Sequence, residues 1–341
     1  MKYIIHVLLA VLIVLPVNAL LSADKCLAVE TEVQQKAVFK KKPRLALALG
    51  GGGIRGAAHI GVLKVFEKEG IPVDYVVGNS MGALVGGLFC AGVPLERIQS
   101  VLSDGSMQKA YLPKSLWMRI MVKPILGLFR GNSYAGLISG RKFEKIINSM
   151  IPENVKNVED LKIPFSCIAF NLIDGKTHLL SKGPINKLIR ASASIPLLLK
   201  PVEIDDGLYL DGGIRNNLPT HEARQSGAPV VVSVEIDSDF SPIPSKNFCS
   251  YSKILDRVVN ATLDEIDREK VEAADIVIRP KLVNIPLLSK DRQYVNEAVH
   301  QGEVAAEAVL PKIKELLKQA SDEPVSEKLV RSSVSQTTLK E

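Results

Sequence analysis

The sequence predicts one α/β domain in which a central, mostly parallel β-sheet is flanked by helices on both faces. Three observations indicate this class. Short runs of apolar and β-branched residues alternate with longer helix-forming stretches along most of the chain. Two of these runs end in glycine-rich turns that lead at once into a helix-forming stretch. Such alternation is typical of a doubly wound sheet, whose ligands bind at the carboxyl ends of the strands.

The expected elements follow from where the apolar runs begin and end. A run over 202–210, interrupted by Asp206 and Gly207, predicts a β-hairpin with an Asp-Gly turn. The other expected strands cover 45–49, 75–78, 165–173, 229–236 and 275–279, and the expected helices cover 54–68, 81–91, 219–227, 250–273 and 291–318. A chain of 341 residues is long enough to bury the core of such a domain.

Composition divides the chain into four parts. Residues 1–23 are expected to form a signal peptide or N-terminal anchor, 24–43 a basic linker, 44–318 the folded domain and 319–341 a disordered polar tail. Lys2 precedes an apolar run over 4–15, and the small residues that follow predict cleavage after Ala19 or Ala23. An uncleaved anchor is the alternative, because apolar character continues to Leu21. We therefore expect an exported protein, periplasmic or secreted, with membrane association as a further option.

Charge and cysteine usage exclude some partners. Much of the net charge of +6 lies in residues 36–44, which hold four lysines and one arginine. A basic stretch behind an exported N-terminus suits anionic lipid headgroups, and the alternative is a solvated linker. With one Trp and no nucleic-acid-binding pattern, no nucleic-acid partner is expected. The four cysteines form no C-x-x-C pair, and no His/Cys cluster has zinc-ligand spacing, so no metal is expected.

The most informative stretch is a G-x-S-x-G pattern at 78–82. An apolar run enters it and a helix-forming run leaves it, which predicts a strand, a sharp turn and a helix with Ser80 at the apex. Gly78 and Gly82 keep this turn open because they carry no side chain. The free N–H groups at the helix start would face any charge that develops beside Ser80. The pattern therefore predicts a nucleophile elbow, and an incidental serine in a Gly-rich turn is the alternative.

A second glycine-rich turn follows the strand at 45–49. Residues 51–56 fit G-x-G-x-x-G, which suggests a dinucleotide site, but the next strand ends at Gly78 without the acidic residue that would hold a ribose. The same N–H groups can instead stabilise an oxyanion, and Gly52 and Gly53 are the expected donors. Arg55 is expected to fix this loop or to strengthen its positive field, and an ordinary surface salt bridge is the alternative. No nucleotide or other cofactor is therefore expected.

A serine nucleophile requires a base, and the histidines do not supply an obvious one. None of the five has a recognisable triad setting. The predicted hairpin instead delivers Asp211 at the end of a strand, followed by Gly212 and Gly213, which let the backbone approach a neighbour. A carboxylate there can accept the proton of Ser80 directly if burial and hydrogen bonds tune its pKa.

These residues carry a resemblance to a known family. The blocks at 51–56, 78–82 and 211–213, in this order, resemble the signature blocks of patatin-like phospholipases. The segment 190–196, Arg-Ala-Ser-Ala-Ser-Ile-Pro, resembles the stretch that precedes the aspartate in that family. The resemblance covers about residues 44–280, and the one mild departure is Asp-Gly-Gly where Asp-Gly-Ala is commoner.

The resemblance implies a serine acyl hydrolase of the phospholipase A or lysophospholipase kind. It implies a Ser-Asp dyad without histidine, lipid acyl esters as substrates, and neither metal nor nucleotide. Transferred by position, Ser80 is the nucleophile, Asp211 is the proton acceptor, and the oxyanion hole is formed by Gly51, Gly52, Gly53 and Arg55, with motif support from Gly56, Gly78, Gly82, Gly212 and Gly213.

Residues 107–138 are expected to control access to the site. They combine Trp117 and Met121 with spaced cations, as an interfacial amphipathic helix would, so we expect a lid or membrane-docking element; a helix packed in the core is the alternative. For the whole chain, the rival functions are a membrane-associated lipid-binding or scaffold protein and an acyltransferase on the same fold. Sequence alone leaves headgroup, chain length and oligomeric state open.

Overall fold

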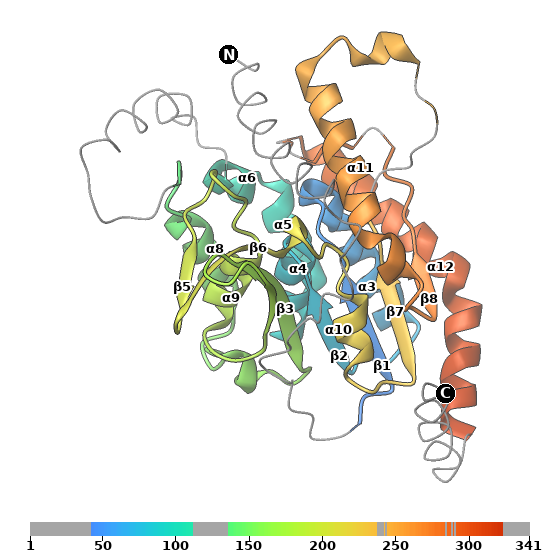
Figure 1. Ribbon diagram of the computed structural model, residues 1–341. Helices are drawn as coiled ribbons and strands as arrows, with labels where there is room; N and C mark the ends of the chain where they lie inside the picture. The colour runs from blue at the N-terminus through green and yellow to red at the C-terminus, as the bar shows by residue number, and fades with distance from the viewer. Residues whose placement is uncertain are drawn as a thin grey trace, which may run out of the picture.

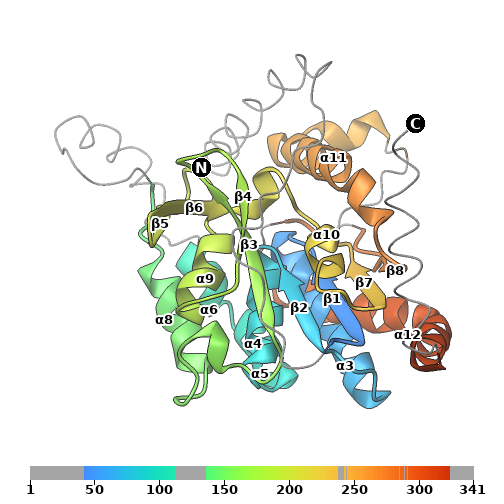
Figure 2. The ribbon, with the colours of Figure 1, turned by 60° about the horizontal axis from the view of Figure 1, so that its bottom comes forward.

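The structure is a computed structural model, and it describes residues 42–111, 136–236, 242, 244–283, 285–287, 289 and 291–322. One sheet crosses the described part of the chain, with helices on both of its faces (Figure 1 and Figure 2). This confirms the predicted fold class. The expected signal or anchor, most of the basic linker and the end of the polar tail lie outside the described residues.

The eight strands of the sheet form two differently built halves. Their order is β5-β6-β3-β2-β1-β7-β8, and β4 also pairs with β3. The strands are β1 (Leu45–Leu49), β2 (Tyr75–Gly78), β3 (Phe165–Asn171), β4 (Thr177–Leu180), β5 (Val202–Ile204), β6 (Gly207–Asp211), β7 (Val230–Val234) and β8 (Ile276–Ile278).

The parallel half contains β3, β2, β1, β7 and β8. Its register places Leu49 beside both Gly78 and Val234, so the turns that follow β1 and β2 begin at the same edge of the sheet. The other half is antiparallel: β4 and β6 both pair with β3, and β5 pairs with β6. The predicted hairpin is thus confirmed, although its turn is formed by Asp205 and Asp206 and Gly207 already begins β6, because Asp205 adopts the positive φ that the turn requires. β4 was not expected from the sequence.

The helices form one layer on each face of the sheet. They are α3 (Ala58–Lys68), α4 (Met81–Cys90), α5 (Leu95–Ser103), α6 (Ser106–Tyr111), α8 (Arg141–Met150), α9 (Ile185–Ser192), α10 (Thr220–Arg224), α11 (Tyr251–Val271) and α12 (Arg292–Asp322). α12 continues past the boundary expected at residue 318. No helix in the described ranges combines the length and the apolar character needed to cross a bilayer.

Alternation along β1 shows how the two faces are filled. Leu45, Leu47 and Leu49 belong to the larger core, which also contains apolar side chains of α3, α4, α5 and α12. Ala46 and Ala48 belong to a smaller core with Ala223 of α10 on the opposite face. Because β1 is buried on both faces, its sequence is a continuous apolar run, as expected for a central parallel strand.

Candidate active site

Ser80 occupies the sharp turn between β2 and α4. Its backbone has φ 50° and ψ −112°, a strained conformation for a residue with a side chain. A side chain at Gly78 would meet the backbone of Gly82 and Ala83, and one at Gly82 would meet the carbonyl of Leu49. The two glycines are thus required by backbone contacts, and the turn has the geometry predicted for a nucleophile elbow.

The elbow is held by hydrogen bonds from both sides. The N–H of Asn79 donates to the carbonyl of Leu49 at 2.9 Å. The N–H of Ser80 donates to the hydroxyl oxygen of Ser192, at the end of α9, at 3.0 Å. Ser192 belongs to the 190–196 block of the sequence, and the carbonyl of Ser194 in that block accepts from the N–H of Asp211 at 2.9 Å. This block therefore joins the serine turn to the strand that carries the aspartate.

The glycine loop after β1 lies directly against the serine turn. Gly50 and Gly51 donate their N–H groups to the carbonyls of Val234 and Asn217, at 3.1 and 3.2 Å. Within the part of the chain that the structure describes, the N–H groups of Gly52 and Gly53 have no acceptor. Both residues line the cavity beside Ser80, and Gly53 has a positive φ of 57°. These are the two donors that the sequence singled out.

Arg55 is placed differently from the other members of the expected oxyanion hole. Its side chain is 2% exposed and is not among those that line the cavity. Its Nε donates to the carbonyl of Ile285 at 2.6 Å, and its guanidinium also donates to Asn260 and, at 3.1 Å, to Asp256 of α11. The alternative of a surface salt bridge is therefore wrong, and the expectation that Arg55 fixes the loop fits this geometry.

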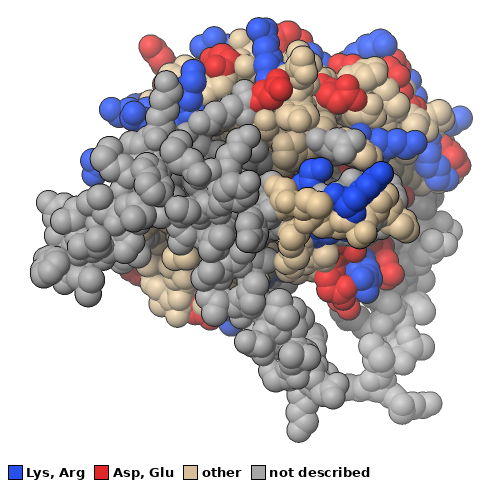
Figure 3. Space-filling view, turned by 90° about the horizontal axis from the view of Figure 1, so that it is seen from above, with Lys and Arg blue, Asp and Glu red and all other residues tan. Residues whose placement is uncertain are grey.

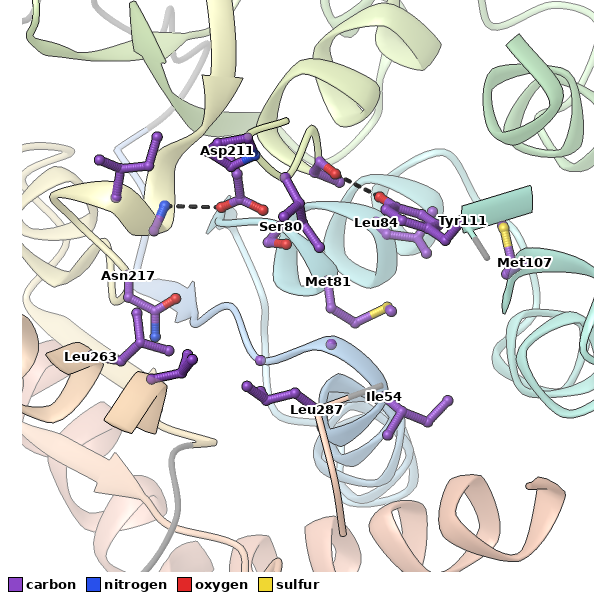
Figure 4. A pocket seen from close by; sticks show the side chains of 18 of the residues that line it. Ile54, Ser80, Met81, Leu84, Met107, Tyr111, Asp211, Asn217, Leu263 and Leu287 are labelled. Carbon is purple, nitrogen blue, oxygen red and sulfur yellow. Dashed lines mark hydrogen bonds between the residues drawn. The ribbon is translucent and has the colours of Figure 1, made fainter. Parts of the chain in front are cut away.

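Asp211 ends β6 and lies beside Ser80 (Figure 4). Its side chain is 8% exposed, and one carboxylate oxygen accepts from the N–H of Gly213 at 2.9 Å. Burial raises the pKa of Asp211 from 3.8 to about 6, and hydrogen bonds from Ser80, Gly213 and the Asn79 side chain limit that rise. A carboxyl group with this pKa is ionised at neutral pH and is more basic than an exposed aspartate.

The remaining glycines of the motifs allow close approach. A side chain at Gly56 would meet that of Met81, and one at Gly212 would meet the Asn79 amide and the carbonyl of Ile168. A side chain at Gly213 would lie 3.2 Å from the amides of Asn79 and Asn217. The three sequence blocks therefore meet at one point because glycine leaves room for it.

An apolar cavity of about 280 Å³ opens beside Ser80 and Asp211. Figure 4 shows Leu84, Met107 and Tyr111 on one side of Ser80 and Ile54, Leu263 and Leu287 on another. The Tyr111 hydroxyl donates to the carbonyl of Ala193 at 2.7 Å, so its ring presents apolar surface to the cavity. Such a cavity suits an apolar ligand held by few polar groups.

Two of the histidines have packing roles in the structure. His59 is fully buried, its Nε2 lies 2.8 Å from the carbonyl of Gly50, and burial lowers its pKa to about 4. A neutral His59 that donates to this carbonyl supports the glycine loop from below. His178 pairs with Asp174 at 2.7 Å. Among the described residues, no group of three or more His, Cys, Asp or Glu is arranged to hold a metal ion.

Two site residues lie outside the set that the sequence singled out as functional. Asn79 is inside the G-x-S-x-G pattern but occupies an "x" position, and its amide reaches Asp211. Asn217 follows the Asp-Gly-Gly block, and its amide accepts from the Asn79 side chain at 3.1 Å. The sequence feature that could have indicated Asn217 is the pair of adjacent asparagines at 216 and 217, in a loop after a strand.

The fold and this site define a class of α/β proteins that present a serine on a strand-to-helix elbow, next to a buried carboxylate and a loop of free N–H groups. Within that class, the chain belongs to the patatin-like phospholipase family. Its residues 47–224, more than half of the 341 residues, match the model of that family. This confirms the family resemblance seen in the sequence.

Relatives of known sequence agree with this assignment. An uncharacterized NTE family protein of Mycobacterium tuberculosis (strain ATCC 25618 / H37Rv) is 33% identical over 221 residues, which cover 64% of this chain and 57% of that protein. Neuropathy target esterase sws of Drosophila melanogaster is 34% identical over 197 residues, 57% of this chain and 13% of that protein. The chain thus spans little more than half of the first relative and a small part of the second.

Solved structures with a partly similar course of the chain include one bacterial and one human protein. VipD from Legionella pneumophila has a TM-score of 0.43 at 15% identity, covering 89% of this chain and 73% of VipD. Human GIVD cytosolic phospholipase A2 has a TM-score of 0.45 at 10% identity, covering 82% of this chain and 59% of that chain.

Proposed function

We propose that this protein is a serine lipid acyl hydrolase that releases fatty acids from lipid esters, with Ser80 as nucleophile and Asp211 as proton acceptor. One observation carries the proposal. A strained, half-buried serine is hydrogen-bonded to a buried carboxylate whose pKa is about 6, beside two free backbone N–H groups and an apolar cavity. Family membership supports a lipid hydrolase, and the geometry supports the proposed residue roles.

The reaction proceeds in two halves. The Asp211 carboxylate takes the proton of the Ser80 hydroxyl as the oxygen attacks the ester carbonyl carbon, which gives a tetrahedral oxyanion. The bond to the alcohol oxygen then breaks, Asp211 returns the proton to that oxygen, and an acyl-serine remains. In the second half, water attacks the acyl-serine and gives its proton to Asp211. The bond between the acyl carbon and the Ser80 oxygen then breaks, Asp211 returns the proton to that oxygen, and the fatty acid is released.

The oxyanion is stabilised by groups that need no rearrangement. The free N–H groups of Gly52 and Gly53 border the same cavity as Ser80 and are held by a loop whose ends are hydrogen-bonded. Loss of one such donor typically slows acyl transfer by about 10²- to 10³-fold. The start of α4 next to Ser80 adds the positive end of its dipole.

The cavity indicates the class of substrate. Its lining is almost entirely apolar and lies on both sides of Ser80, which suits the acyl chain of a lipid better than a polar ester. We extend the proposal to action at a lipid surface, by an exported or membrane-associated enzyme. Six of the seven large apolar side chains that are exposed in the described residues lie on segments at the carboxyl-end edge of the sheet: Leu172, Ile173, Leu197, Ile254, Val258 and Val283.

Replacement of Ser80 tests the proposed function. Ser80→Ala should abolish turnover of a medium-chain 4-nitrophenyl ester and covalent labelling by a fluorophosphonate, because only an activated serine reacts. Circular dichroism and the unfolding temperature should stay close to those of the wild type. A Ser80→Ala protein that still hydrolyses the ester at the original rate would refute the assignment. A wild-type protein that binds lipid but is not labelled by the fluorophosphonate would favour the lipid-binding alternative.

A further inference from the structure

Asn217 contacts two of the three elements that form the site. Its side-chain Nδ2 donates to the carbonyl of Gly51 at 3.3 Å, and its own carbonyl accepts from the N–H of Gly51 at 3.2 Å. Its side-chain Oδ1 accepts from the Nδ2 of Asn79 at 3.1 Å. Asn217 is 4% exposed, so each of these bonds forms away from water.

The position of Asn217 is itself fixed from α11. The carboxylate of Asp267, which is 1% exposed, accepts from the N–H of Asn217 at 3.2 Å and from that of Leu218 at 2.9 Å. Lys270 lies 3.7 Å from the same carboxylate. The backbone of Asn217 is therefore anchored, and its side chain has a defined direction toward the glycine loop and the serine turn (Figure 4).

Asn79 connects Asn217 to Asp211 through hydrogen bonds of its side-chain amide. Its amide nitrogen has two N–H groups, one of which donates to Asn217. The Asn79 side chain also makes a hydrogen bond to the carboxyl group of Asp211. Since an amide is planar, holding one N–H on Asn217 sets the direction of the other. The chain of contacts runs from Gly51 through Asn217 and Asn79 to Asp211.

We propose that Asn217 is a positioning residue that holds the glycine loop, and through Asn79 the Asp211 carboxylate, in the arrangement that ester cleavage requires. The inference rests on the proposed hydrolase function for its chemistry, whereas the contacts themselves are independent of it. Asn217 does not need to touch the reacting atoms, because both of its effects act through Gly51 and Asn79.

Removal of the Asn217 amide should raise the pKa of Asp211. Without Asn217, Asn79 is free to turn, and the hydrogen bond that favours the ionised form of Asp211 is weakened. Among the described residues, the other titratable group near this carboxyl is Tyr111 of α6. The charged groups near Asn217 are Asp267 and Lys270 of α11, with Glu222 of α10 close to both. These residues are retained in an Asn217 variant, but Asp267 loses its hydrogen bond from the Asn217 side chain. Asn79→Ala leaves Asp267 untouched, so an upward shift of the Asp211 titration that both variants share reports the loss of the Asn79 bond.

The test is a titration of Asp211 in the full chain, followed by the carboxyl ¹³C signal and assigned with Asp211→Asn. In Asn217→Ala the midpoint should move upward by about half a pH unit or more, as expected for one lost hydrogen bond to a charged group. Asn79→Ala should give a similar shift. The double variant should shift no further than Asn79→Ala alone, because Asn217 acts through Asn79.

Asn216→Ala is the matched control. Asn216 is the same residue type one position away and is 5% exposed, but its amide donates to Glu222 at 2.7 Å. Its loss removes a buried hydrogen bond without touching Gly51 or Asn79, so the Asp211 midpoint should stay within about 0.2 pH unit of the wild type, well below the shift of one lost bond. Asn217→Ser replaces Asn217→Ala if the latter fails to fold by circular dichroism.

Ester turnover measured on the same proteins separates the two proposals. In Asn217→Ala the kcat should fall by about 10²-fold, with less change in KM, because oxyanion donors are displaced. An unchanged Asp211 midpoint in a folded Asn217 variant, or equal shifts in the Asn216 and Asn217 variants, would overturn the positioning role. A wild-type protein without any turnover would overturn the hydrolase proposal alone, since the titration still decides what Asn217 does.

Discussion

At the scale of single residues, the site depends on environments that only burial creates. Asp211 is an ordinary carboxyl group in the sequence, yet its burial beside Ser80 raises its pKa to about 6. The same burial lowers the pKa of His59 to about 4, which keeps this imidazole neutral beside the glycine loop. Burial thus gives Asp211 the basicity that its proposed role requires, and it keeps His59 a neutral hydrogen-bond donor.

The raised pKa of Asp211 predicts an acid limb in the pH profile. The base must be ionised, so kcat/KM should fall about tenfold per pH unit below pH 6 and level off above it. The folded chain also holds this proton more tightly than the unfolded chain, so ionisation of Asp211 reduces stability as pH rises from about 4 to about 6. At pH 7.5, Asp211→Asn should therefore lack activity and unfold at a temperature no lower than that of the wild type. A wild-type activity that is constant down to pH 4.5 would contradict this role.

Arg55 allows a test that separates support of the loop from direct action on the oxyanion. Arg55→Lys keeps the charge but cannot reach Ile285, Asn260 and Asp256 together. We expect a loss of roughly 2–3 kcal/mol in the free energy of unfolding, because buried acceptors lose their donors. Activity at 20 °C should change by only a few fold. A large loss of kcat at an unchanged unfolding temperature would instead indicate a direct role.

At the scale of elements, the glycine loop is supported from below by a tight pair of helices. α3 begins where the loop ends, and α12 crosses it at Gly61 and Gly302. A side chain at Gly302 would meet the carbonyl of Ala58, the first residue of α3, and one at Gly61 would meet the carbonyl of Val299. The two glycines let the helix backbones approach until they touch.

Gly302→Ala tests this close approach. The added methyl group should force α12 away from α3 and lower the free energy of unfolding by roughly 1–3 kcal/mol, as measured by denaturant titration. Val304→Ala on the same helix is the control, because Val304 is exposed and its loss should cost less than about 0.5 kcal/mol. Equal stabilities of the two variants would show that the helices are not in tight contact.

At the scale of the whole molecule, one end of the sheet gathers both the site and the exposed apolar side chains. The glycine loop, the serine turn and the α11 side of the cavity all lie where the parallel strands end (Figure 1). Seen from above, the described surface carries cationic and anionic side chains interspersed with uncharged ones (Figure 3). Because charges of both signs are mixed on this surface, contact with lipid at this end would depend on apolar side chains more than on electrostatic attraction.

Charges placed on these apolar side chains should weaken binding to lipid vesicles. Ile173→Asp combined with Val283→Asp should reduce binding to phosphatidylcholine vesicles by at least about 30-fold, since each of the two buried apolar side chains contributes roughly 1 kcal/mol or more. Turnover of a short soluble ester should be unchanged. Val304→Asp, an exposed position on α12, is the control. Undiminished vesicle binding by the double variant would rule out this face.

The expected lid over 107–138 remains a prediction, because residues 112–135 lie outside the described part of the chain. The flanking residues are placed: α6 contributes Met107 and Tyr111 to the cavity, and Ile138 forms a bridge with Leu199. Both ends of the segment are therefore anchored near the cavity. The expected roles of Trp117 and Met121 await measurement.

The sequence by itself determined the α/β class, the parallel strands, the hairpin, and the serine, aspartate and glycines of the site, because these depend on local periodicity and on turn geometry. It also predicted Gly52 and Gly53 as neighbours of Ser80, and all three residues line the same cavity. Only the tertiary structure decided that Arg55 is directed to α11, that Asn217 joins the glycine loop to Asn79, and that Asp211 has a pKa of about 6. These properties arise from contacts between residues far apart in the chain and from the exclusion of water, and no local pattern encodes either.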